Sequence, residues 1–261
     1  CYSMIAKKIV DRDAIIEGGH LLGEILERLS LAVRPGITTR ELDTLAEQWI
    51  LAVGGTPSFK GYQSEGDKRP YPATVCTSVN NEVVHGIPSD RALKNGDIMG
   101  LDIGMQYKGF FTDTAVTVPV GAVSQEVIQL LRDTSAALEA GIQAAIIGNR
   151  IGDIGHAVSA VAKPRKRGVV RELVGHGVGT QVHEDPQIPN YGEPGTGERI
   201  VENMVLALEP MFNMGDRKVK LAGDGWTWVT RDGSLSAHFE HTILITNEGP
   251  VVVTRRPSEH A

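Results

Sequence analysis

Four stretches of the chain carry apolar residues at the spacing of one helical face. The pattern repeats every three or four positions over residues 11–33, 39–53, 124–148 and 151–162. Thr38 and Glu41 have the spacing of a capping box at the start of the second stretch, and Ser124 suits the N-cap of the third. The pattern therefore predicts two pairs of amphipathic helices, one early in the chain and one in its middle.

Shorter stretches between and after these helices are rich in β-branched, aromatic and other apolar residues, which indicates strands. They cover residues 74–79, 82–88, 98–105, 110–118, 204–208 and 236–245. Residues 106–109, Gln-Tyr-Lys-Gly, have the composition of a turn, so the third and fourth stretches are predicted to form a hairpin. In the last stretch, alternation places His238, Glu240 and Thr242 on one face.

The composition is that of an ordinary globular chain. Its 261 residues are 41% apolar, which is ample for a sizeable core. A formal net charge of −6 argues against nucleic acid and anionic membranes as partners, and no run of eighteen apolar residues predicts a membrane span. The two cysteines, Cys1 and Cys76, exclude a disulfide framework, and without a signal-like leader we expect a cytoplasmic protein. We interpret residues 1–3 as a cloning remnant and residues 4–261 as one domain.

Two carboxylates interrupt the apolar hairpin. Centring its turn between Tyr107 and Lys108 pairs Asp102 directly with Asp113, with their Cβ atoms roughly 5 Å apart on one face. Strands are depleted in aspartate, and buried carboxylates are rare unless they are paired or bind a metal. We therefore expect this face to coordinate a cation. Two solvated carboxylates on an edge strand are the alternative.

Three further residues with metal-binding side chains lie in apolar segments of the second half. Glycines flank His176, which implies close backbone packing, while Glu209 ends one predicted strand and Glu240 lies within another. Together with the hairpin pair, they make four carboxylates and one imidazole. Four negative charges match two divalent cations, and a mostly oxygen ligand set with one nitrogen favours Mn, Fe or Co, with Zn as an alternative. Two such ions roughly 3.5–4 Å apart would polarise a carbonyl, which is hydrolytic chemistry.

The same five residues, in this order and these local contexts, resemble the ligand set of the methionine aminopeptidase family and its pita-bread relatives, prolidase and aminopeptidase P. The likeness runs from about residue 5 to residue 254. The motifs that resemble the type I methionine aminopeptidases lie at residues 81–88, 175–179, 183–186, 208–211 and 240–242. The resemblance implies an α+β, pita-bread fold, in which a pseudo-two-fold, curved antiparallel sheet is backed by helices.

Residue by residue, the resemblance implies two divalent metal ions per chain. Asp102 would chelate one ion, and Asp113 and Glu240 would bridge both. His176 and Glu209 would complete the other ion, and Glu209 would also handle the proton transfers.

The resemblance also assigns residues to substrate binding. His85 would lie beside the scissile amide nitrogen, and His183 would lie near the substrate carbonyl as it becomes tetrahedral. Tyr71 and Cys76 match positions that line the pocket for the methionine side chain, and Trp226 matches its aromatic lid. A thioether suits an apolar pocket lined by aromatic residues.

Three features depart from the usual type I pattern. Val182 stands where phenylalanine usually precedes the second histidine, and Gly104 makes the Asp-x-Gly sequence closer to that of prolidase. The connection from Phe59 to Tyr71 is longer than usual, and either Phe59 or Tyr62 could face the pocket. We expect the pocket to be at least as roomy as usual.

The favoured function is removal of the N-terminal methionine from nascent polypeptides, preferably before a small second residue. A proline-directed dipeptidase or aminopeptidase using the same metals is one alternative, and a metal-free homologue that binds protein partners is another. Prolidase and aminopeptidase P normally carry an extra N-terminal domain, for which 261 residues leave no room, and this disfavours the proline-directed enzyme. The intact ligand set disfavours the metal-free homologue. The expected partners are nascent N-termini, with the ribosome as a further candidate, and the expected state is a monomer.

Overall fold

The computed structural model describes residues 9–64 and 69–260, so the expected cloning remnant at residues 1–3 lies outside the described residues. The helices are α1 (Ile9–Ala32), α2 (Thr39–Ala52), α3 (Gln125–Ala144) and α4 (Ile151–Ala162), with short 3-10 turns η1 (Lys163–Arg165) and η2 (Pro257–His260). The strands of the first half are β1 (Thr56–Pro57), β2 (Val75–Val79), β3 (Glu82–Val84), β4 (Ile98–Tyr107) and β5 (Phe110–Pro119). Those of the second half are β6 (Gly168–Val169), β7 (Gly175–Gly177), β8 (Glu184–Ile188), β9 (Val205–Leu208), β10 (Met211–Asn213), β11 (Val219–Leu221), β12 (Trp228–Thr230), β13 (Ser236–His238), β14 (Glu240–Thr246) and β15 (Gly249–Val252).

All four predicted helices are present, and α2 and α3 begin where their predicted caps place them. Thr38 and Glu41 form the reciprocal capping box of α2, and the Ser124 hydroxyl accepts a hydrogen bond from the Val127 N–H at the start of α3. None of the helices within residues 9–64 and 69–260 combines the length and apolar character needed to cross a membrane.

A curled antiparallel sheet joins the two halves of the chain. Its path runs β1-β4-β5-β14-β9-β7-β8, and β2 and β15 are added beside β4 and β14. Within this path, the strands of the first half meet those of the second half where β5 pairs with β14. We call this junction the central seam. This arrangement confirms the expected α+β, pita-bread architecture.

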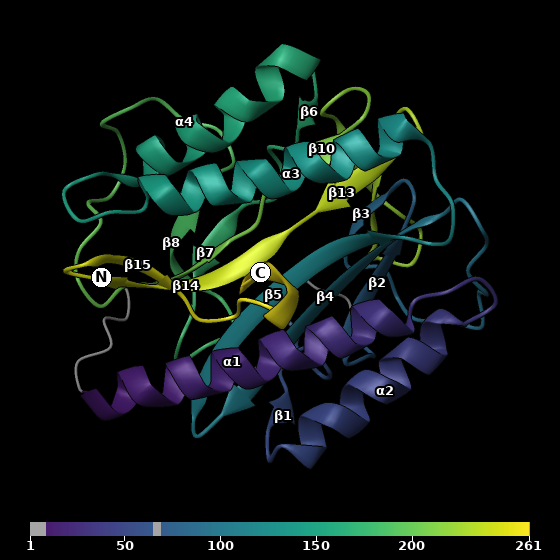
Figure 1. Cartoon of the computed structure of the whole chain (residues 1–261), viewed down its shortest axis with the longest axis horizontal. Helices are drawn as coiled ribbons and strands as arrows, with labels where there is room; N and C mark the ends of the chain where they lie inside the picture. The colour runs from purple at the N-terminus through teal and green to yellow at the C-terminus, as the bar shows by residue number, and fades with distance from the viewer. Residues whose placement is uncertain (1–8, 65–68, 261) are drawn as a thin grey trace.

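The helices back the sheet in two pairs, one for each half (Figure 1). Helix α1 packs on β4 and β5 and helix α2 on β1 and β2, whereas α3 and α4 pack on each other and on strands of the second half. Fully buried leucine and isoleucine side chains fill the space between helices and sheet, including Leu22, Leu26, Leu42 and Ile50. This packing leaves the opposite, inner face of the sheet available for polar side chains.

The hairpin of β4 and β5 is present, but its predicted register was wrong by two residues. Asp102 lies opposite Ala115, and Asp113 lies opposite Gly104. The reason is the turn: Lys108 and Gly109 both have positive φ, 49° and 87°, so they form the two-residue connection that suits the twist of a hairpin. A shift of two residues preserves side-chain direction, and both carboxylates stay on one face.

Candidate active site

All ten residues predicted for the site line one cavity of about 230 Å³ on the inner face of the sheet. They are Tyr71, Cys76, His85, Asp102, Asp113, His176, His183, Glu209, Trp226 and Glu240. They come from both halves of the chain, so the cavity depends on the seam between β5 and β14. The structure brings the whole predicted set together.

The hairpin supplies one wall of the cavity. Asp102 and Asp113 are both buried, and each carboxyl group influences the pKa of the other. Cys76 lies opposite Asp102 across the β2–β4 ladder, and its thiol helps to lower the pKa of this carboxyl group against the effect of burial. Burial raises the pKa of the Cys76 thiol well above its usual value, so the thiol stays protonated and neutral.

The glycines around His176 allow a short strand to enter between two others. A Cβ at Gly175 would overlap the Ala207 carbonyl oxygen on β9, and a Cβ at Gly177 would overlap the Asp185 carbonyl oxygen on β8. His176 Nδ1 lies 2.9 Å from the Gly177 carbonyl oxygen, which can only accept a hydrogen bond. The ring proton therefore sits on Nδ1, and Nε2 is left with a lone pair that faces the cavity.

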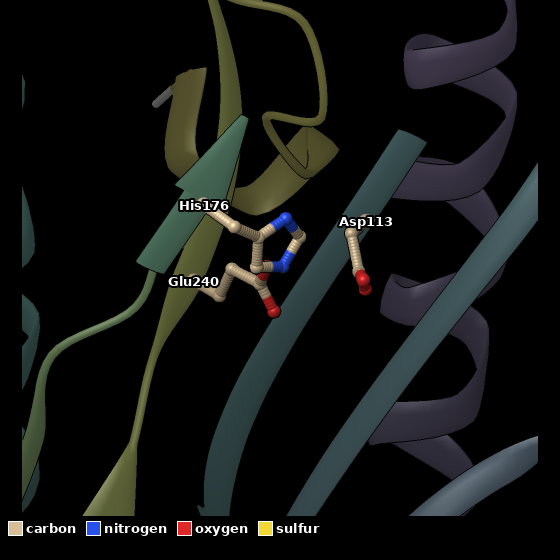
Figure 2. Close-up of side chains that lie close together, drawn as sticks. All are labelled: Asp113, His176 and Glu240. Carbon is tan, nitrogen blue, oxygen red and sulfur yellow. The ribbon is translucent and has the colours of Figure 1, made fainter. Parts of the chain in front are cut away.

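Glu209 and Glu240 complete the wall opposite the hairpin. Glu209 follows the last residue of β9, and its Oε1 lies 3.7 Å from His176 Nε2. Glu240 begins β14 opposite Ala115 of β5, which places it across the seam from the hairpin. Figure 2 shows His176 and Glu240 reaching toward Asp113; His176 lies on β7 and Glu240 on β14, two strands that flank β9 in the sheet. One ligand atom from each of these three residues lies within 4.8 Å of the others.

The four carboxylates and His176 together lack a compensating positive charge. Burial raises the pKa of Asp102 to about 7, and burial together with neighbouring carboxylates raises the pKa of Asp113, Glu209 and Glu240 well above their usual values. Burial lowers the pKa of His176 to about 3, so the imidazole is neutral and cannot supply that charge. Four carboxylates that resist joint ionisation, beside a neutral imidazole, match the needs of divalent cations.

Unpartnered buried oxygens support the same fit. Asp102 Oδ1, Asp113 Oδ1 and Glu240 Oε1 are buried without a hydrogen-bond partner. Buried acceptors are otherwise almost always satisfied, because a buried polar group without a partner costs free energy. The donor set therefore fits metal ions bound among these oxygens and the Nε2 of His176.

Backbone strain and close packing present His85 to the cavity. His85 follows β3 in the left-handed region, at φ 60°, and next to it a Cβ at Gly86 would overlap the Thr77 carbonyl oxygen. The Gly86 carbonyl accepts the Tyr71 hydroxyl at 2.9 Å, which ties this turn to the pocket. Strain of this kind at a cavity is typical of functional residues.

His183 is held between two rings. Its Nδ1 lies 2.7 Å from the Tyr62 hydroxyl, and its ring packs edge-on against Tyr62 and against His176. The hydroxyl of Tyr62 can donate to Nδ1, which leaves the Nε2–H free to donate into the cavity. Part of His183 reaches solvent, but desolvation on its packed side lowers its pKa, which favours this neutral form.

The far end of the cavity is apolar. Phe59, Tyr71, Cys76, Val182 and Trp226 belong to one buried cluster, with Tyr62 packed against it. Phe59 and Tyr62 both line the cavity, and Tyr62 in addition reaches His183. Gly104 allows this arrangement, because a Cβ there would lie 2.7 Å from Cε1 of the Phe59 ring.

The sequence analysis missed the place of His238 at the site and the contact between Tyr62 and His183. His238 is buried, its Nε2 has no hydrogen-bond partner, and it lies 3.6 Å from Glu209 Oε2 and 4.0 Å from Glu240 Oε2. Its position two residues before Glu240, on the same face of the predicted strand, was the available signal. The contact between Tyr62 and His183 joins residues 121 positions apart and had no local signal.

Comparison with known proteins agrees with this geometry. The profile of metallopeptidase family M24 matches residues 13–247. The chain is 46% identical to a methionine aminopeptidase of Clostridium perfringens, over 96% of this chain and 98% of that protein. It is 47% identical to methionine aminopeptidase 1 of Bacillus subtilis, over 92% and 94% of the two chains.

Solved structures give the same result. A crystal structure of methionine aminopeptidase from Thermotoga maritima superposes with a TM-score of 0.92 at 40% identity, over 97% of this chain and all of the other. A prolidase from Pyrococcus furiosus shares the fold at a TM-score of 0.73 and 20% identity, and this chain covers 65% of it. From sequence and fold together, the chain belongs to metallopeptidase family M24 and, within it, to the methionine aminopeptidases.

Proposed function

We propose that the chain uses two divalent metal ions to remove the N-terminal methionine from nascent polypeptides, preferably before a small second residue. The observation that carries this proposal is the meeting of three buried carboxylates, the mostly buried Glu209 and His176 in one cavity, beside an apolar pocket. The same proposal has the enzyme act as a cytoplasmic monomer on nascent N-termini, with the ribosome as a further candidate partner.

We assign the ligands by position in the cavity and by the resemblance. Asp102 would hold one ion, His176 would hold the other, and Asp113 and Glu240 would bridge them, with Glu209 beside His176. Two bound ions would supply Lewis acidity toward the scissile carbonyl and toward the attacking water. The oxygen-rich set favours Mn, Fe or Co, with Zn as an alternative.

The remaining roles belong to side chains of this chain. Glu209 would take the proton of the attacking water and deliver it to the leaving amine, which its buried position between His176 and His238 allows. His183 would donate from Nε2 to the carbonyl oxygen as negative charge develops there. His85, on the opposite side near Trp226, would lie beside the scissile nitrogen.

The apolar pocket would select the first residue. Tyr71, Cys76 and Trp226 would surround the methionine side chain, and Phe59 and Val182 would share the boundary of the pocket. In this arrangement Phe59 contributes the aromatic bulk that Val182 lacks. Methionine suits the site because a flexible thioether adapts to aromatic walls.

The proline-directed alternative loses its main support. Gly104 had favoured it, but the close approach of Phe59 and Ser58 gives that glycine a local reason. The likeness to prolidase shows the fold alone. A binding protein without metals is disfavoured because all five proposed ligands line one cavity with unpartnered oxygens.

A direct assay decides between these functions. The purified protein would be stripped with a chelator, reloaded separately with Mn, Fe, Co or Zn, and given a Met-Ala peptide and an Ala-Pro peptide. We expect release of methionine that requires added metal, with little cleavage of Ala-Pro. Preferential cleavage of Ala-Pro would favour the dipeptidase, and no cleavage of either peptide with any metal would favour the binding protein.

A further inference from the structure

The central seam is paired much less than the strands beside it. Strands β4 and β5 pair along their whole length, whereas β5 and β14 pair only through Glu240 with Ala115 and His241 with Thr114. This short pairing lies next to Asp113 and Glu240, the two residues proposed to bridge the metals. The seam therefore needs other contacts to hold the bridging residues in place.

Where the backbone pairing of the seam stops, threonine hydroxyls form hydrogen bonds to the backbone of the facing strand. Continuing the register by one residue would place Thr242 opposite Asp113, but there the Thr242 hydroxyl enters the seam. It donates to the Asp113 carbonyl oxygen at 2.7 Å and accepts from the Asp113 N–H at 2.9 Å. Both backbone groups of Asp113 are thus satisfied by one side chain.

The other end of the seam repeats this arrangement in reverse. The Thr117 hydroxyl of β5 donates to the His238 carbonyl oxygen at 2.8 Å and accepts from the His238 N–H at 2.9 Å. Thr242 follows His238 by four residues, and Thr117 follows Asp113 by four. The two contacts therefore relate the two halves of the chain by a local two-fold symmetry, with the short pairing at its centre.

We propose that Thr117 and Thr242 are positioning residues for the metal centre, which hold the two sides of the seam one hydroxyl group apart. This inference rests on the proposed metal ligands. Each threonine is buried, 4% and 0% exposed, so no water can replace a lost hydroxyl without rearrangement. Removing the Thr242 hydroxyl would leave the Asp113 N–H and C=O unsatisfied, or let β5 close toward β14 and move the Asp113 carboxylate.

The decisive comparison is Thr242→Val against Thr242→Ser. Valine keeps the shape of threonine and removes the hydroxyl, whereas serine keeps the hydroxyl and removes the methyl group. With Mn²⁺ as the probe, measured by calorimetry and by metal content after dialysis, we expect Thr242→Val to weaken affinity about 10–100-fold. Thr242→Ser should stay close to the parent protein, and Thr117→Val should show a loss of about tenfold or less, because Thr117 acts on Glu240 through His238.

Thr134→Val is the matched control. Thr134 is also fully buried, and its hydroxyl donates to the Leu130 carbonyl within α3, away from the seam. This variant should lower thermal stability without changing Mn²⁺ affinity, so it separates a loss of stability from a loss of positioning.

Each outcome has a defined meaning. Parent-like Mn²⁺ affinity and stoichiometry in a folded Thr242→Val protein would overturn the inference. If neither Thr242→Val nor Thr117→Val folds while Thr134→Val does, the hydroxyls support the fold alone, which also overturns it. A parent protein that binds none of Mn, Fe, Co and Zn would instead refute the proposed metal site itself.

Discussion

The two walls of the cavity are built in different ways. The wall with Asp102 and Asp113 is a single hairpin of two ten-residue strands, closed by a two-residue turn. The wall with His176, Glu209 and Glu240 is assembled from the three-residue strand β7, the end of β9 and the start of β14. The pairing of a hairpin fixes the distance between its own side chains. In the assembled wall, the positions of the side chains depend on the glycines around His176, on contacts across the central seam and on the C-terminal residues behind β14. We therefore expect the two walls to respond differently to mutation.

One substitution in each wall should give the largest effect. Asp113→Asn in the hairpin and Glu240→Gln in the assembled wall each remove a proposed bridging charge, so both should abolish peptidase activity and lower metal content from two ions toward one or none. The loss of metal affinity should exceed the 10–100-fold typical of a residue that only supports a ligand. Metal analysis and activity assays on the purified variants measure both effects.

Asp133→Asn is the control for this pair. Asp133 is also a buried carboxylate, but it is paired with Arg165 and Arg167 away from the cavity. It should keep both metal ions even if it is less stable. Normal turnover with two ions bound in either bridging variant would refute the ligand assignment.

The two histidines outside the ligand set should separate catalysis from metal binding. His85→Ala and His183→Ala should each lower kcat by about 10²–10³, the usual cost of losing one donor to developing charge, with metal content nearly unchanged. His156→Ala, at an exposed position on α4, should change neither quantity. Loss of metal from either cavity variant would instead make that histidine a ligand.

The apolar pocket gives a smaller effect on selectivity. A hydrophobic pocket discriminates by about 1–3 kcal/mol per methylene, so Val182→Phe should favour methionine over leucine and norleucine, and Phe59→Ala should have the opposite effect. Relative rates on Met-Ala, norleucine-Ala and Leu-Ala peptides measure this. Unchanged relative rates in both variants would show that neither residue bounds the first-residue pocket.

Mutation of the ionic contacts behind β14, on the side of the assembled wall away from the cavity, should give the smallest effect. His241, next to Glu240, points to the other side of β14, where its Nε2 lies 3.3 Å from Glu259 Oε2, and Arg256 also contacts Glu259. Burial opposes ionisation of Glu259, but the hydrogen bond with His241 and the charge of Arg256 outweigh it and lower the pKa to about 2. A lowered pKa adds stability that is fully present above the unfolded-state value near pH 4.3 and is lost as pH falls toward 2.

Glu259→Gln tests this support. We expect it to cost about 1 kcal/mol of unfolding free energy at pH 6–7, with the difference from the parent protein shrinking between pH 4 and pH 2. Glu139→Gln, which breaks the more exposed ion pair with Arg255, should cost less. Urea unfolding at several pH values measures both, and a pH-independent difference would contradict the ionic explanation.

The contrast between the walls also explains what could be predicted from the sequence. The helices, their caps and the hairpin follow from local periodicity and turn chemistry, and so does the presence of Asp102 and Asp113 on one face. The register required the φ angles of Lys108 and Gly109, which residue types specify only loosely. His176, Glu209 and Glu240 lie in short segments far apart in the chain, so their convergence could be inferred only from the family resemblance.

The remaining contacts join residues that no local pattern connects. Tyr62 meets His183, and the Thr242 hydroxyl meets the Asp113 backbone, because the sheet curls and β5 meets β14 at the seam. The hydroxyl group of Tyr62 or of Thr242 could form hydrogen bonds in many environments, so the residue type alone does not predict its partner. Only the tertiary structure shows which partner it has.

The closed apolar end of the cavity has a consequence for where a polypeptide can be cut. Phe59, Tyr71 and Trp226 are each buried and line the apolar end of the cavity. A chain that continued past its first residue in that direction would meet these side chains. Under the proposed function, the cavity would admit only the free end of a polypeptide, and internal methionines of the same polypeptide would escape cleavage.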